Sequence, residues 1–223
     1  SARGGDILSK ARLVYGVHSV RAMLSYHPRQ VKRLFITKSK KQDTVELHDM
    51  AISAGIQVVV QSLKDFDSMT SASAVHQGIA VECEECVTYS ERDISSIISS
   101  AENPLVLILD QVQDPHNFGA CLRSANAMGV CCVLIPKDRS VGMTPVVRKV
   151  ASGATVTTPV IVVTNLSRAL KELQDAGLWS VGLVAGDECD LPLRQIDLTG
   201  PMALVMGNEA KGLRRLTKKN CDY

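Results

Sequence analysis

Residues 104–136 read PLVLILDQVQDPHNFGACLRSANAMGVCCVLIP, and this stretch decides the fold class. Two continuous apolar runs, Leu105 to Leu109 and Val130 to Ile135, flank a segment whose apolar residues recur at helical spacing. Uninterrupted apolar strands on either side of an amphipathic helix are typical of a parallel sheet that is covered on both faces. The stretch therefore predicts an α/β fold.

The rest of the second half repeats this alternation of apolar strands and helical patterns. The further strands are predicted at Val160 to Val163, Trp179 to Val184 and Met202 to Met206. Ligands of such sheets bind at the carboxyl ends of the strands. We therefore expect the functional residues in the segments that follow the strands, which are Asp110 to Asn117, Pro136 to Ser140, Thr164, Ala185 to Glu188 and Gly207 to Gly212.

The first half predicts a smaller α/β unit. Strand patterns at residues 33–37, 56–60 and 78–85 enclose helical patterns, and the polar, Ser-rich segment VTYSERDISSIISSAENP follows them. We predict a disordered or artificial lead at residues 1–12, a small N-terminal domain at 13–86, a linker at 87–103 and the larger parallel-sheet domain at 104–223.

Composition excludes several classes of protein. With 45% hydrophobic and 22% charged residues, the chain is typical of a soluble globular protein, and it has no signal peptide or apolar run of membrane-spanning length, so we expect a cytoplasmic protein without a membrane partner. Seven cysteines, two of them adjacent in an apolar run, indicate reduced thiols. No H-E-x-x-H is present, and Cys83 and Cys86 lack a second ligand pair, so no metal is predicted.

Positive charge is concentrated near the start of the chain. Residues 1–50 carry ten Lys or Arg against four acids, whereas residues 51–103 carry two against eight. One cluster lies within thirteen residues and could neutralise RNA phosphates, although an ordinary solvated face explains it equally well. Its members are Arg29, Lys32, Arg33, Lys38, Lys40 and Lys41.

Two strand ends carry polar residues of interest. Asn117 follows the first strand of the larger domain and caps the next helix in the simplest interpretation, while Arg123 lies six residues further on. After the last strand, Gly207 permits close backbone approach, and Asn208 and Glu209 suit a helix start. The phosphate-loop, dinucleotide and G-x-S-x-G motifs are absent.

The segments LDQVQDPHNFGACLRSANAMGV and ALVMGNEAKGLRRLTKKNCD resemble the first two motifs of the SpoU family of RNA ribose 2′-O-methyltransferases. HQGIAVEC and YGVHSVRAML resemble parts of that family's N-terminal substrate-binding domain, so the resemblance covers nearly the whole chain. It implies a C-terminal trefoil knot, a homodimer, ribosomal RNA as substrate and S-adenosylmethionine as cofactor. The cofactor-binding positions would be Ala185, Met206, Gly207 and Asn208.

The resemblance also implies that Asn117, Arg123 and Glu209 are the catalytic residues. Because a guanidinium keeps its proton in proteins, we expect Arg123 to stabilise the developing alkoxide and grip a phosphate rather than act as the base. Asn117 would orient Arg123 or the ribose, Glu209 would help to hold this arrangement, and His116 is an alternative base.

The family's third motif, which contains Asn and Ser and completes the knot and cofactor site, would follow Tyr223 and is absent from this sequence. The expected target is a guanosine in 23S rRNA. The alternatives are a methyltransferase acting on transfer RNA, one conferring antibiotic resistance, or a non-catalytic RNA-binding protein of ribosome assembly.

Overall fold

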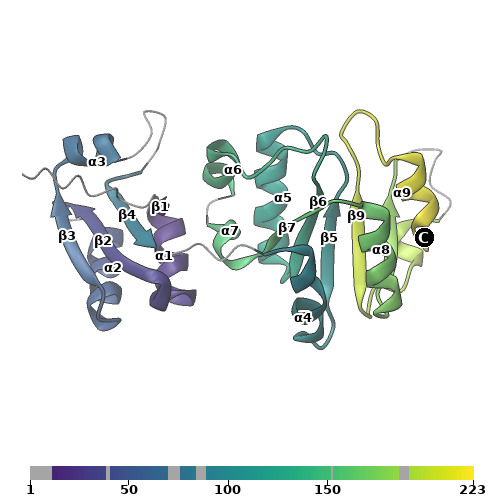
Figure 1. The fold of residues 1–223 in the computed structure, drawn as a ribbon, viewed down its shortest axis with the longest axis horizontal. Helices are drawn as coiled ribbons and strands as arrows, with labels where there is room; N and C mark the ends of the chain where they lie inside the picture. Colours follow the sequence, from purple (N-terminus) through teal and green to yellow (C-terminus); the bar gives the residue numbers. More distant parts are fainter. Residues whose placement is uncertain (1–11, 39–40, 70–75, 84–88, 152, 186–190) are drawn as a thin grey trace, which may run out of the picture. The chain divides into compact units, whose positions relative to one another are not determined.

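The computed structural model describes residues 12–38, 41–69, 76–83, 89–151, 153–185 and 191–223. They form two compact units, divided between residues 87 and 88. Each unit is built on a sheet of its own (Figure 1).

The first unit has a four-stranded sheet in the order β1-β4-β2-β3. Strand β2 pairs in parallel with β3, whereas β4 lies antiparallel to both β1 and β2. Phe66 and Leu47, both completely buried, belong to helices that pack on this sheet. This confirms the small α/β unit. Its elements are β1 (Arg12–Tyr15), α1 (Val17–Tyr26), η1 (Pro28–Gln30), β2 (Val31–Thr37), α2 (Gln42–Ser53), β3 (Gln57–Gln61), α3 (Leu63–Met69) and β4 (Ile79–Cys83).

The second unit has a five-stranded sheet in the order β7-β6-β5-β9-β8, and every pairing in it is parallel. This confirms the predicted parallel sheet. Strand β6 begins at Cys132 rather than at Val130, because Gly129 has a φ of +71° and Val130 donates to the carbonyl of Ala125, which ends the preceding helix. The strands are β5 (Leu105–Leu109), β6 (Cys132–Pro136), β7 (Val160–Val163), β8 (Trp179–Leu183) and β9 (Met202–Met206).

Helices cover both faces of this sheet (Figure 1). Alternate residues of β5 point to opposite faces, so Leu107 and Leu109 enter one buried cluster with Phe118 and Leu122, whereas Ile108 enters another. The helical segments are α5 (Pro115–Ala127), α6 (Pro145–Val150), α7 (Ala154–Thr157), α8 (Leu166–Asp175), η4 (Leu193–Gln195) and α9 (Arg215–Asn220). Two-sided burial is the reason why the inner strands β5, β6 and β9 are uninterrupted apolar runs.

Part of the predicted linker folds with the second unit. It contains η2 (Glu91–Asp93) and α4 (Ile94–Ser99), and Ile94 and Ile98 are buried in a core cluster of the second unit. Glu91 accepts hydrogen bonds from the backbone and hydroxyl of Thr164 and from Arg168, and these contacts lower the pKa of Glu91. Apolar packing and this carboxylate hold the segment against the sheet.

The helices and the cysteines can be compared with what the composition predicts. No helix in the described ranges is both long and apolar enough to cross a membrane. Cys121, Cys131, Cys132 and Cys221 are free thiols, and burial raises the pKa of Cys132 to about 12. Cys86 lies outside the described residues.

Candidate active site

Helix α5 carries the first motif and begins one turn earlier than a cap at Asn117 would place it. Asp114 is the N-cap, its carboxylate accepts from the backbone N–H of His116 at 3.1 Å, and Pro115 occupies the first helical position. The expectation that Asn117 caps the helix is therefore wrong. Asp-Pro at a helix start was the signal for this cap, since Asp favours the N-cap and Pro the first helical position.

Because Asp114 caps the helix, the side chain of Asn117 can make another contact, and it binds Glu209 of the second motif. Its side-chain amide donates to Oε1 of Glu209 at 3.1 Å, although the two residues are 92 positions apart. The contact follows from the sheet, because β5 and β9 are parallel neighbours with Leu109 opposite Met206, and both chains leave the sheet at the same edge. Both side chains are exposed, so the pair is open to a ligand.

Arg123 lies further along α5 and is also exposed. It makes no hydrogen bond or ion pair with any of the described residues, Asn117 and Glu209 included. The predicted amphipathic helix is confirmed, since its apolar residues Phe118, Leu122 and Ala125 are buried against the sheet. The guanidinium of Arg123 is thus not neutralised by any carboxylate that the structure describes.

The loop from β9 to α9 is held by Asn208. Its side-chain oxygen accepts from the backbone N–H groups of Ala210 and Lys211, and its amide donates to the carbonyl of Gln111 at 3.0 Å. Two backbone hydrogen bonds, of 3.0 and 2.8 Å, also join Asn208 and Gly212. The side chain of Asn208 therefore fixes the second motif's loop to the segment that follows β5.

Position 207 has no room for a side chain, so glycine is required there. A Cβ at this position would lie 2.2 Å from the carbonyl carbon and 2.3 Å from the oxygen of Gly212, and 2.4 Å from the nitrogen of Leu213. These are backbone atoms, which cannot swing aside as a flexible side chain can. The prediction that Gly207 permits close backbone approach is confirmed.

A buried carboxylate that the sequence analysis did not single out supports the same loop. Asp110 is completely buried, and its Oδ2 accepts from Nε of Arg214 at 3.0 Å and from the hydroxyl of Thr217 at 2.7 Å. Nη2 of Arg214 lies 2.8 Å from Oδ1 in an ion pair that lacks hydrogen-bond alignment. In the sequence, Asp110 can be noticed only as an Asp directly after an apolar strand. Its spacing does not identify Arg214 and Thr217 as its partners.

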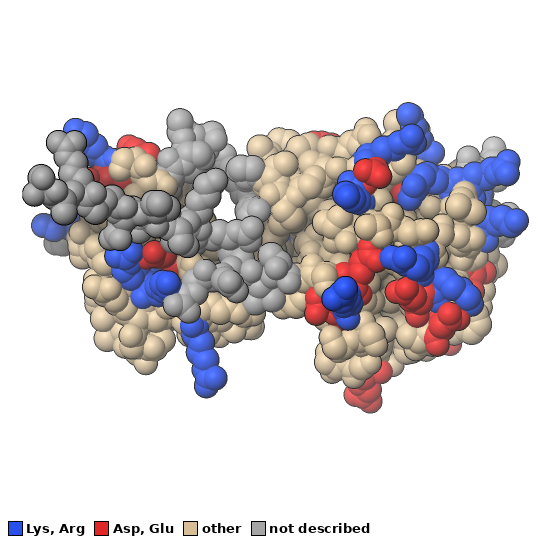
Figure 2. All heavy atoms as spheres, viewed as in Figure 1, with Lys and Arg blue, Asp and Glu red and all other residues tan. Residues whose placement is uncertain are grey.

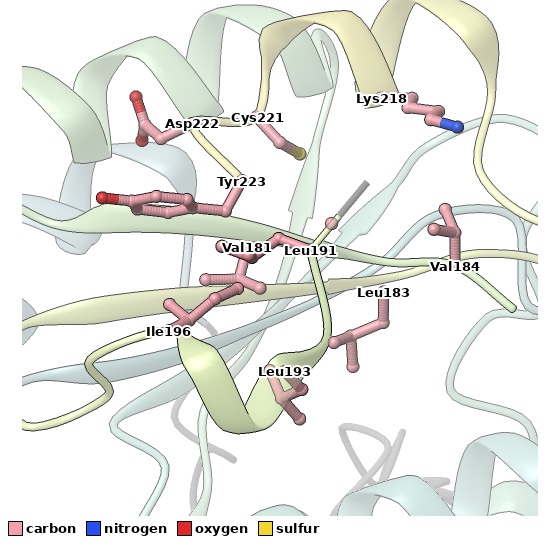
Figure 3. A pocket seen from close by; sticks show the side chains of 11 residues that line it. Val181, Leu183, Val184, Leu191, Leu193, Ile196, Lys218, Cys221, Asp222 and Tyr223 are labelled. Atoms are coloured by element: carbon pink, nitrogen blue, oxygen red, sulfur yellow. The ribbon is translucent and has the colours of Figure 1, made fainter. Parts of the chain in front are cut away.

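A cavity of about 300 Å³ lies beside the carboxyl half of β8. In Figure 3, Lys218 of α9 and the following Cys221 and Asp222 lie on one side of it, whereas Leu183 and Leu193 lie on the other. Burial raises the pKa of Cys221 to about 11, so its thiol is protonated at neutral pH. The residues lining the cavity are Val181, Gly182, Leu183, Val184, Leu191, Leu193, Ile196, Lys218, Cys221, Asp222 and Tyr223.

Two of the predicted cofactor-binding positions, Ala185 and Met206, adjoin residues that line this cavity. Leu183 is opposite Met206 in the parallel register, so the segment leading to Ala185 and the one leading to Gly207 leave the sheet side by side. Ala185 is exposed and follows Val184, which lines the cavity. The other residues of the predicted strand-end segment after Ala185 lie outside the described residues.

The last residues of the chain pair with β8. Gly182 donates to the carbonyl of Tyr223, and the backbone N–H groups of Asp222 and Tyr223 donate to the carbonyl of Ser180. The carboxylate of Asp222 accepts from the backbone and hydroxyl of Ser180 and from Gln174. Burial raises the pKa of Asp222, but these hydrogen bonds outweigh it and lower the pKa on balance.

The predicted RNA-binding cluster is divided by β2. Arg29 and Lys32 lie at the start of the strand, whereas Lys38 and Lys41 follow its end, about 20 Å away for a strand of this length. Arg33 is bound to the buried Glu82 at 2.5 Å. Lys40 lies outside the described residues. A cluster that is compact in the sequence therefore does not form a single patch.

A second group of cations lies in the second unit. Figure 2 shows Lys and Arg gathered over the β9–α9 loop and α9 on the face in view. The Lys and Arg residues of this segment are Lys211, Arg214, Arg215, Lys218 and Lys219. Of these, Arg214 is the one paired with Asp110.

Comparison with known proteins assigns the family. Residues 104–223 match the SpoU rRNA Methylase family, and residues 13–86 match the family described as RNA 2′-O ribose methyltransferase substrate binding. The chain belongs to the SpoU family. The segments Leu109–Val130 and Ala203–Asp222, which carry Asn117 and Glu209, both fall within the first match.

Individual SpoU relatives are similar over most of their length. The 23S rRNA (guanosine-2′-O-)-methyltransferase RlmB of Coxiella burnetii is 44% identical over 218 residues, which are 97% of this chain and 86% of the relative. The protein of the same name from Yersinia pestis is 44% identical over 213 residues, 95% of this chain and 85% of the relative.

A solved structure shares the fold. The SpoU methyltransferase AviRb from Streptomyces viridochromogenes, in complex with the cofactor AdoMet, aligns with a TM-score of 0.68 at 19% identity, covering 95% of this chain and 78% of that one.

Proposed function

We propose that this chain transfers a methyl group from S-adenosylmethionine to the ribose 2′-hydroxyl of a guanosine in 23S rRNA. The observation that carries the proposal is the contact between Asn117 and Glu209, which joins the two family motifs at one edge of the parallel sheet. The relatives named as 23S rRNA (guanosine-2′-O-)-methyltransferases support the substrate, since this chain matches about 86% of their length.

The residues beside β8 suit S-adenosylmethionine. The cavity has the size and the largely apolar lining of a small-molecule site, and Lys218 and Asp222 supply polar groups. We assign Ala185, Met206 and Gly207 to the cofactor side of the site, with Asn208 holding the loop that carries Gly207. When bound, the cofactor supplies a methyl group on a positively charged sulfur, open to in-line attack by the ribose oxygen.

Positioning and charge stabilisation are the tasks left to the protein. A guanidinium does not lose its proton, so Arg123 acts by stabilising the negative charge that develops on the ribose oxygen. Arg123 forms no ion pair with a described carboxylate, which supports this role, because an ion pair would weaken the positive potential that its guanidinium exerts on the ribose oxygen. Asn117, held by Glu209, orients the ribose, and the proton leaves to water or to an RNA phosphate. His116, exposed beside Asn117, is the alternative base.

The first unit would deliver RNA to this site. Arg29, Lys32, Lys38 and Lys41 are exposed at the two ends of β2 and suit contacts with phosphates, which position a substrate without reading its sequence. Arg33 is less suited, since Glu82 already neutralises it.

The assembly and knot belong to the same proposal. Family membership supports a homodimer acting on rRNA in the cytoplasm and a trefoil knot, which the pairing of the last residues with β8 would extend. Sedimentation of the purified protein tests the dimer.

Methyl-labelled S-adenosylmethionine and unmodified 23S rRNA test the reaction. A 2′-O-methyl group blocks alkaline cleavage at its own linkage, so label is expected in alkali-resistant dinucleotides that contain guanosine. Label in transfer RNA alone, or in alkali-sensitive nucleotides, would contradict the proposal. Absence of transfer while RNA still binds would favour the non-catalytic RNA-binding alternative.

A further inference from the structure

The loop that follows β6 lies at the same edge of the sheet as the Asn117–Glu209 pair. Its backbone is fixed at both ends, because Lys137 donates to the carbonyl of Val163 and Val141 donates to the carbonyl of Val112 at 2.9 Å. Val112 is buried and belongs to the segment that leads from β5 into α5. The β6 loop is therefore fastened directly to the segment that carries the first motif.

The backbone of this loop adopts a conformation that side-chain-bearing residues rarely take. Arg139 has a φ of +60°, and Gln111, in the neighbouring loop, has a φ of +68°. The carbonyl of Gln111 accepts from the side chain of Asn208, so three strand-end loops, after β9, β5 and β6, are joined in a row. An Arg where glycine would fit the backbone better indicates that the side chain itself is needed.

The cations of the β6 loop have no carboxylate partner in the described part of the chain. Lys137 and Arg139 are exposed and form no ion pair with the described residues. Three other cations of the second unit do have carboxylate partners, since Lys171 pairs with Asp175, Arg214 with Asp110 and Arg168 with Glu91. Asp138, which lies between the two cations, is itself exposed and makes no ion pair within the described ranges.

We propose that Lys137 and Arg139 bind a backbone phosphate of the RNA next to the nucleotide that is methylated. The proposal rests on the proposed function and adds a positioning site to it. A planar guanidinium matches two phosphate oxygens, and the adjacent ammonium adds charge without fixing an angle. Because the β6 loop is joined to the segment before α5, a phosphate held there places the neighbouring ribose relative to Asn117.

Binding measurements on the full chain test this site. Arg139→Gln and Lys137→Gln remove one charge each, and Lys171→Gln, on the exposed face of α8, removes the same charge elsewhere. The affinity for a single-stranded 23S rRNA fragment is measured with S-adenosylhomocysteine present, as a function of salt. We expect Arg139→Gln to weaken RNA binding about tenfold and to reduce the salt slope by about 0.7. Lys171→Gln and the affinity for S-adenosylmethionine should stay at wild-type values.

Arg139→Gly separates binding from backbone structure. Glycine adopts the observed φ freely, so this variant should melt at or above the wild-type temperature while losing RNA affinity as Arg139→Gln does. RNA affinity at the wild-type level in both variants would overturn the proposal, and so would an equal loss in Lys171→Gln.

Methyl transfer distinguishes this proposal from the one on which it rests. Wild-type protein that binds RNA through Arg139 but never methylates 23S rRNA would refute the proposed function alone. Single-turnover transfer that is slowed in Arg139→Gln at subsaturating RNA, and restored by raising the RNA concentration, would support the phosphate site.

Discussion

Replacement of Gly207 by alanine tests the geometry of the second motif's loop. The new Cβ would lie 2.2 to 2.4 Å from three backbone atoms of Gly212 and Leu213, whereas non-bonded carbon atoms are comfortable at about 3.5 to 4.0 Å. No side chain can turn away to make room. The backbone at Gly207 and the backbone at Gly212 must therefore move apart by roughly 1 Å or more. This movement breaks the two hydrogen bonds between Asn208 and Gly212.

The expected cost follows from these two effects. Overpacking of this kind costs about 1 to 3 kcal/mol and each of the two lost hydrogen bonds about 1 kcal/mol, so Gly207→Ala should lower the free energy of unfolding by about 3 to 5 kcal/mol. In a domain of this size the melting temperature should fall by about 10 to 15 °C. The loop also carries Glu209 and adjoins the cavity beside β8, so affinity for S-adenosylmethionine should fall at least tenfold.

Calorimetry of the melting transition and titration with S-adenosylmethionine measure both effects. Gly200→Ala is the matched control, because a Cβ at Gly200 would meet no atom within 4 Å. If Gly207→Ala melts and binds the cofactor like Gly200→Ala, the close approach does not constrain the loop and the reasoning is refuted.

Three further predictions concern charges at the same edge. Arg123→Ala should slow methyl transfer at least 100-fold and leave the affinity for S-adenosylmethionine unchanged, as single-turnover assays and titration would show; near-normal turnover would rule out its assigned role. Arg214→Ala leaves the buried Asp110 uncompensated and should destabilise the protein by about 3 kcal/mol, whereas adding Asp110→Asn should recover part of this loss in urea unfolding; no recovery would show that the charge of Asp110 is not the cause. The pKa of Asp222 is lowered in the folded state, so this carboxylate stabilises the fold above about pH 4, and the contribution is lost as the pH falls through the folded pKa. Asp222→Asn should therefore flatten the fall in melting temperature between about pH 5 and pH 3, and an unchanged acid profile would contradict the assignment.

The sheet strands of the second unit could be predicted from the sequence. Strands β5 and β9 begin and end where their apolar runs do, because both faces of each strand are buried and the runs stop at Asp110 and Gly207. Strand β1 was missed, since four residues with one apolar pair carry too little periodicity to be distinguished from a loop. The cap of α5 was misassigned to Asn117 because capping preference alone does not separate Asn from the Asp three residues earlier.

The candidate site could be predicted only in part from the sequence. The motifs named Asn117 and Glu209, but their contact depends on β9 lying beside β5, a pairing that brings together residues 92 positions apart. Asp110 and Arg214 show the same limitation, because an Asp after a strand and an Arg before a helix are common until the fold joins them. The basic cluster shows the opposite limitation, since cations that are neighbours in the sequence lie at the two ends of an extended strand. Their role in RNA binding stays a prediction.

The sequence by itself determined the family, the parallel-sheet class and the identity of the residues at the strand ends, because periodicity and short motifs are local properties of the chain. Only the tertiary structure decided which strand ends are neighbours and that Asn117 binds Glu209 instead of capping its helix. It also decided that Arg33 is neutralised by Glu82, whereas Arg123 and Arg139 pair with no carboxylate among the described residues. These outcomes depend on distances between residues far apart in the chain. Strand order and long-range pairing set those distances, and no local pattern encodes them.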